Sequence, residues 1–222
     1  MRAELKKPYA AVRIPGGFSA GGNQMWFHNK VIRKCGCGAV AAFDLFRYVS
    51  GKNDTCHLPS ELEIEDYCRQ LVRVQHRYFP LIYPTGINGF MLVGGLNRLF
   101  RENGIPLHAK WAASRNKLLE RIEHMLSEDY PVILAVGPNF PLFWQKHGVK
   151  LYHRSRNGIL RPAADICGHY VTVVSINDEW MKISSWGQFY EINLNEYMNY
   201  VKKYSNHLFS NIVLIEEKRR AD

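Results

Sequence analysis

The hydrophobic pattern of the chain changes its period near Tyr130, and this change limits the folds that the chain can adopt. Before Tyr130, apolar residues recur every three or four positions, as they do in amphipathic helices. After it, short runs rich in β-branched and aromatic residues take over, which is typical of strands. A block of helices followed by a block of strands predicts an α+β fold. We expect one domain over 1–222, with a helical lobe over about 20–128, an antiparallel β-sheet lobe over about 129–217 and an active-site cleft between them.

Four segments of the first half have helical periodicity. The first begins near Cys37 and stops at Gly51. In the second, Ser60 is expected to be the N-cap, with Glu63 completing a capping box. Ser114 is expected to cap the fourth, which is the most regular amphipathic pattern of the set. The predicted helices span 38–51, 59–79, 89–104 and 113–129.

Five segments of the second half are predicted to be strands. They are short, rich in Val, Ile and aromatic residues, and separated by turn residues. Short connections favour hairpins, and therefore an antiparallel sheet. The predicted strands span 131–137, 169–177, 179–187, 189–194 and 209–217.

A thiol stands where the first predicted helix begins. The free N–H groups and partial positive charge of a helix N-terminus lower the pKa of a thiol, so we expect Cys37 to be a thiolate nucleophile at neutral pH. Gly36 and Gly38, on either side, would let a substrate backbone approach closely. Cys35 is an alternative nucleophile two residues earlier. Close packing of small side chains against the sheet is the alternative explanation of this segment.

An imidazole stands at the start of a predicted strand. His169 follows Gly168 and precedes a run of β-branched residues, a setting that the other eight histidines lack. A thiol nucleophile needs a base that accepts its proton and later protonates the leaving group. His169 is therefore the candidate base.

A polar strand end follows His169. Ser184, Ser185 and Trp186 end the next predicted strand 15 to 17 residues later. A hairpin that turns near Asp178 would pair residue 169 with residue 186 or 187, which brings Ser184 within diagonal reach of the imidazole. Asp178 would lie about 30 Å away, at ~3.3 Å per residue. We therefore expect Ser184, and not Asp178, to orient His169.

The order of these features resembles the papain-like cysteine peptidase superfamily, and the C39-like peptidases in particular. The resemblance covers roughly 20–195, including the separation of 132 residues between Cys37 and His169. It implies a papain-like fold with Cys37 as nucleophile and His169 as general base. It also implies that Gln24 donates to an oxyanion hole with the Cys37 backbone N–H, and it places Ser184 where the family has Asn.

The chain departs from the family pattern at three points. Cys35 also fits the motif Cys-Gly-x-x-Ala. Gln24 precedes Cys37 by 13 residues, a longer separation than the family's, and Asn29 is a substitute donor. Ser184 replaces an amide or carboxylate, and a hydroxyl orients an imidazole less firmly.

The implied function is that of a hydrolase, either a cysteine peptidase (a thiol protease) or an amide or thioester hydrolase that works through an acyl-enzyme. Two alternatives stay open: a non-catalytic papain-like peptide-binding module, and an acyltransferase with the same thioester chemistry. The expected substrate is a peptide or small amide. The segments 85–89 and 137–144 are expected to be loops that line the cleft.

Composition and charge exclude several other classes. The 29 Lys and Arg residues outnumber the 20 Asp and Glu residues, but they are scattered, so no specific nucleic-acid partner is expected. No apolar run reaches the ~18–20 residues of a membrane helix, and the N-terminus lacks a secretory signal pattern, so we expect a cytoplasmic protein without a membrane partner. The oligomeric state is not predicted. The five cysteines form no disulfide or zinc motif, and no metal or cofactor is expected.

Overall fold

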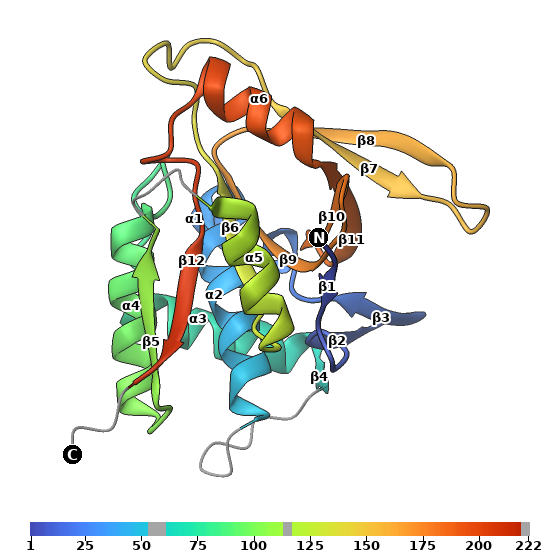
Figure 1. Ribbon diagram of the computed structural model, residues 1–222. Coiled ribbons are helices and arrows are strands. Elements are labelled where there is room, and N and C mark those ends of the chain that lie inside the picture. Colours follow the sequence, from blue (N-terminus) through green and yellow to red (C-terminus); the bar gives the residue numbers. More distant parts are fainter. Residues whose placement is uncertain (53–60, 113–116, 219–222) are drawn as a thin grey trace.

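The computed structural model describes residues 1–52, 61–112 and 117–218 and has a mixed α+β fold with largely antiparallel sheets (Figure 1). In the largest sheet the strands follow the order β1–β9–β10–β11–β7–β8, and β6 pairs with β9 along the same edge as β1. All pairings in this sheet are antiparallel. Its strands are β1 (Ala3–Glu4), β6 (Val132–Val136), β7 (Val149–Arg154), β8 (Leu160–Ile166), β9 (His169–Ile176), β10 (Trp180–Ser185) and β11 (Gln188–Asn193).

Two smaller sheets complete the β-structure. One contains β3 (Gly17–Ala20), β2 (Ala11–Ile14) and β4 (Glu61–Glu63), with β2 and β4 parallel. The other pairs β5 (Leu107–Trp111) with β12 (Val213–Glu217). The helices are the 3₁₀ helix η1 (Gln24–Trp26) and the α-helices α1 (Lys30–Cys35), α2 (Cys37–Ser50), α3 (Ile64–Tyr78), α4 (Gly89–Glu102), α5 (Leu118–Ser127) and α6 (Leu194–Tyr204).

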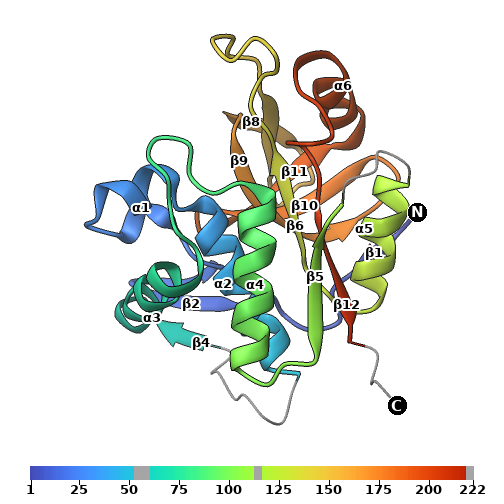
Figure 2. The ribbon, with the colours of Figure 1, turned by 90° about the vertical axis from the view of Figure 1, so that its left-hand side faces the viewer.

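Helix α2 runs through the centre of the molecule. Every residue from Gly38 to Ser50 is buried, as expected for a helix that is apolar on nearly all sides. It packs on β9 of the large sheet and on helices α3 and α4, and Figures 1 and 2 show α4 and the large sheet on different sides of it. The residue at its first position therefore lies where the helices meet the sheet.

The four predicted helices are present, but two of them begin at a later residue than predicted. Helices α2 and α4 agree with the predicted segments. Helix α3 begins only at Ile64, because residues 61–63 pair with β2 as a strand. Helix α5 begins at Leu118. The predicted caps Ser60 and Ser114 lie outside the described residues.

Four of the five predicted strands join the large sheet as β6, β9, β10 and β11. The fifth, β12, pairs instead with β5. Strands β4 and β5 lie within 20–128, so this region is not purely helical. None of the helices in the described part of the chain is both long and apolar enough to cross a membrane.

Candidate active site

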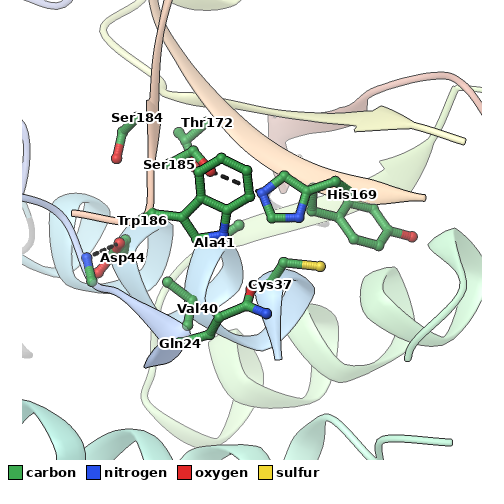
Figure 3. Close-up of a pocket in the computed structure, with 12 residues that line it drawn as sticks. Gln24, Cys37, Val40, Ala41, Asp44, His169, Thr172, Ser184, Ser185 and Trp186 are labelled. Carbon is green, nitrogen blue, oxygen red and sulfur yellow. Dashed lines mark hydrogen bonds between the residues drawn. The ribbon is translucent and has the colours of Figure 1, made fainter. Parts of the chain in front are cut away.

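Cys37 and His169 line the same small pocket, which lies between the start of α2 and strands β9 and β10 (Figure 3). The pocket has a volume of about 20 Å³, the size of a single water molecule. Gln24, Ser184 and Ser185 also line it, so all four predicted site residues meet here. The remaining lining residues are Gly22, Val40, Ala41, Asp44, Tyr170, Thr172 and Trp186.

Cys37 is the first residue of α2, as the sequence predicts. The backbone N–H groups of Gly38 and Tyr170, and its own, approach the sulfur and lower the pKa of the thiol. Burial acts in the opposite direction and outweighs them, so the pKa of Cys37 is raised above its usual range. The resting thiol is therefore protonated at neutral pH, contrary to the predicted thiolate.

Cys35 is held away from this pocket. It is the last residue of α1, it is buried, and its thiol donates a hydrogen bond to the Pro84 carbonyl at 3.2 Å. Cys37 is the cysteine that shares a pocket with His169.

His169 is the first residue of β9, and two neighbours fix its ring. Its Nε2 lies 2.8 Å from the Ser185 hydroxyl oxygen, and the ring packs on the Trp186 indole at a centroid distance of 4.7 Å. Burial lowers the pKa of His169 from its usual 6.5 to about 4, so the imidazole is a neutral base at pH 7. Its second nitrogen is on the side of the ring nearer to Cys37 in Figure 3. No hydrogen bond joins His169 to the Cys37 sulfur among the described residues.

The residue that orients His169 is Ser185 and not the predicted Ser184. Ser184 pairs with Thr172 of β9, so continued pairing sets residue 169 opposite residue 187, as the hairpin argument predicts. Side chains alternate between the two faces of a strand, so Ser185, two residues from residue 187, lies on the same face of the sheet as His169. Ser184 points away from His169 and donates instead to the Ala20 carbonyl at 2.5 Å.

Trp186 and Gly187 form the two-residue turn between β10 and β11, since Ser185 pairs directly with Gln188. Both turn residues have positive φ, 49° and 74°, which matches the tight turn that two-residue hairpins favour. A bulky residue in this conformation is strained. The turn places the indole against the imidazole.

Gln24 lies in η1 and is buried. Its Nε2 donates to the Arg33 carbonyl at 2.6 Å, which fixes the orientation of the amide and leaves its second N–H free for another acceptor. Figure 3 shows this amide directed toward Cys37. The substitute donor Asn29 is exposed and caps α1, and Asp178 is exposed at the far end of β9. Neither reaches the pocket.

A larger apolar cavity of about 450 Å³ adjoins the other side of His169. Residues of the predicted loops 85–89 and 137–144 line this cavity and not the small pocket of Cys37, and Gly89 is already the first residue of α4. Its rim carries four hydrophobic side chains that are more than half exposed, namely Ile82, Phe90, Phe143 and Leu208. Exposed apolar groups that gather around a cavity mark a binding site.

Asp44, a buried carboxylate on α2, belongs to the small pocket although the sequence reasoning passed over it. Its position seven residues after Cys37 puts it two turns along the same helix face, and a charged residue in this apolar run was the available signal.

In the described part of the chain, no group of three or more His, Cys, Asp and Glu side chains could hold a metal ion. No family model matches the chain, and no curated protein matches it.

Proposed function

We propose that the chain is a papain-like cysteine hydrolase that cleaves amide or thioester bonds through an acyl-enzyme on Cys37. One observation carries the proposal. The Cys37 thiol, at the N-terminus of a buried helix, shares a pocket with the His169 imidazole, whose Nε2 is already hydrogen-bonded to the Ser185 hydroxyl. The Gln24 amide on the same pocket supplies a donor for the negative charge that develops on the substrate oxygen.

The chemistry follows from these positions. When Nε2 of His169 carries the ring proton, it donates to Ser185 Oγ and leaves Nδ1 as the acceptor of the thiol proton. The Cys37 sulfur attacks the carbonyl carbon and forms a C–S bond as His169 takes the proton. The Cys37 N–H, which has no acceptor within the helix, and the Gln24 N–H stabilise the oxyanion.

Collapse of this intermediate completes the cycle. The bond to the leaving amine or thiol breaks, and His169 returns the proton to that group. Water then attacks the thioester carbon as His169 takes its proton, the Cys37–carbon bond breaks, and His169 returns the proton to the sulfur, which restores the neutral pair. An amine in place of water would give an acyltransferase with the same residues.

The neutral resting pair fits this scheme. A base with a pKa of about 4 remains unprotonated down to acid pH, and the thiol proton moves only when the substrate is in place. The apolar cavity beside His169 suits a large apolar group on the acyl side of the scissile bond. A peptide with an aromatic or branched aliphatic residue near that bond meets this requirement.

The test is turnover of an aryl ester of an N-acylated phenylalanine. We expect hydrolysis that falls by more than about 100-fold in Cys37→Ser and His169→Ala. Cys35→Ser is the matched control and should retain activity, because Cys35 does not line the pocket. Activity retained in Cys37→Ser would contradict the proposal. Saturable binding of the peptide without any turnover would indicate a non-catalytic binding module instead.

A further inference from the structure

The segment 20–24 carries the Gln24 donor and runs between the large sheet and the helices. On the sheet side, Ser184 donates to the Ala20 carbonyl, and the Ala20 N–H donates to the Gly187 carbonyl at 2.8 Å. On the helix side, the Gly22 N–H donates to Asp44 Oδ2 at 2.8 Å. Figure 3 shows Asp44 at the edge of the pocket, with this hydrogen bond as a dashed line. The segment is thus held from both sides just before Gln24.

Neither glycine of this segment leaves room for a side chain. A Cβ on Gly22 would lie 1.8 Å from the Tyr67 hydroxyl oxygen, and one on Gly21 would lie 2.5 Å from Asp44 Oδ2. Gly21 also has a φ of +76°, which favours glycine. The backbone therefore approaches the buried carboxylate closely, and the contact depends on this approach.

Asp44 has a defined set of partners. Besides Gly22, its carboxylate accepts the Tyr67 hydroxyl at 3.0 Å and lies 3.9 Å from the guanidinium of Arg47, which is itself buried. Arg47 donates to the carbonyl of Ala11, the first residue of β2, in the β2–β3 hairpin that leads into the segment. A buried carboxylate costs free energy unless such partners compensate for its desolvation.

We propose that Asp44 is a positioning residue for the oxyanion hole. It accepts a hydrogen bond from the Gly22 N–H and so holds the segment that carries Gln24 in place. The expected effect on catalysis rests on the proposed function. The contact between Asp44 and Gly22 is independent of that function and can be tested on its own.

The contact is expected to weaken in acid. Burial raises the pKa of Asp44 from its usual 3.8 to about 6, against the lowering effects of Arg47, the Gly22 N–H and Tyr67. Tyr9 also faces the carboxylate, and both tyrosines stay protonated, since their own pKa values are raised. Below about pH 6 the carboxyl group is neutral and accepts the Gly22 N–H less strongly.

The direct test is the NMR shift of the Gly22 amide proton as a function of pH. We expect it to titrate with a midpoint near pH 6 in the wild-type chain and not to titrate in Asp44→Asn. If Asp44→Asn does not fold, Tyr67→Phe is the second variant, and it should shift the midpoint because it removes one donor to the carboxylate. A Gly22 shift that does not titrate, or that titrates equally in Asp44→Asn, would overturn the proposal.

The catalytic test compares two reactions of the same thiol. Asp44→Asn should lower ester turnover about 10-fold, and it should leave the rate of Cys37 alkylation unchanged because alkylation forms no oxyanion. In a Gln24→Ala background, Asp44→Asn should have no further effect. Asp66→Asn, an exposed carboxylate paired with Arg69, is the matched control.

Parallel losses in turnover and alkylation, or a full additional loss of turnover when Asp44→Asn is added to Gln24→Ala, would overturn the positioning role. A wild-type chain without turnover would refute the proposed function and leave the NMR result standing.

Discussion

The reactivity of Cys37 depends on two opposing effects at one residue. The helix N-terminus and nearby N–H groups favour the thiolate, and burial favours the thiol more strongly. His169, with its pKa lowered to about 4, then has to act as the base for each thiol proton. The sequence could indicate the first effect, because a helix start is visible in the pattern. It could not indicate the second, because burial is set by the tertiary fold.

The pH profile of alkylation tests this assignment. We expect the rate of Cys37 alkylation by iodoacetamide to reach a plateau above about pH 5 and to fall near pH 4, where His169 becomes protonated. In His169→Ala the rate should instead rise about tenfold per pH unit, because only free thiolate reacts. Both measurements need a Cys167→Ser background, since Cys167 is exposed. A tenfold rise per unit with His169 present would show that the imidazole does not assist the thiol.

The two adjacent serines of β10 should behave differently. Ser185→Ala removes the hydroxyl on His169 Nε2 and should lower kcat about 10-fold, the equivalent of one hydrogen bond of ~1–1.5 kcal/mol. It should have little effect on unfolding. Ser184→Ala leaves the Ala20 carbonyl without its donor and should cost about 1–2 kcal/mol of stability in denaturant unfolding. Ser184 also holds the Gln24 segment, so the alkylation rate of Cys37, which involves no oxyanion, separates the two serines. Slower alkylation in Ser184→Ala, or an unchanged rate in Ser185→Ala, would argue against the assignment of Ser185.

At the scale of elements, the sequence predicted part of what depends on local pattern and missed helix α6 and the β7–β8 hairpin. Helices α2 and α4 and strands β6, β9, β10 and β11 follow from periodicity and turn residues. The strand at 61–63 could not be predicted, because its pairing partner β2 lies about 50 residues earlier. The face of Ser184 was missed for a related reason. A hairpin argument that is uncertain by one residue reverses the direction of every side chain.

Two adjacent glycines in α4 provide a test of helix packing. A Cβ on Gly95 would lie 2.3 Å from the Tyr78 carbonyl oxygen, whereas one on Gly94 would meet no atom within 4 Å. Gly94→Ala should therefore stabilise the protein by about 0.5–1 kcal/mol through helix propensity. Gly95→Ala should destabilise it by about 1–3 kcal/mol through overpacking. Thermal unfolding of the pair would measure both, and the same sign for the two variants would contradict this packing of α3 and α4.

At the scale of the whole molecule, two titratable groups of the pocket, the half-buried His169 and the buried Asp44, affect stability in opposite directions. His169 has a lowered pKa, so the unfolded chain binds more protons between about pH 4 and 6.5, and this contribution to stability grows as the pH rises. Asp44 has a raised pKa, so the folded chain binds more protons between about pH 4 and 6, and this contribution shrinks as the pH rises. In the wild-type chain the two contributions largely cancel.

Single variants should separate these contributions. Relative to wild type, Asp44→Asn should gain stability as the pH rises from about 4 to 6, and His169→Ala should lose stability as the pH rises from about 4 to 6.5. Each change should be on the order of 3 kcal/mol. Urea unfolding at several pH values measures both. Because each variant is compared with wild type, titrations elsewhere in the chain cancel. Slopes of the same sign in the two variants would contradict the titration of the pocket.

The central claim is that Cys37 forms a covalent acyl-enzyme with the help of His169, and mass spectrometry of the trapped intermediate tests it most directly. After brief mixing with an aryl ester of N-acylated phenylalanine and acid quenching, we predict one acyl group per chain, located on Cys37 by fragmentation of the peptide that also contains Cys35. The adduct should be absent from His169→Ala at the same mixing time. An adduct on Cys35 or Cys167, or one on Cys37 that forms equally fast without His169, would contradict the account.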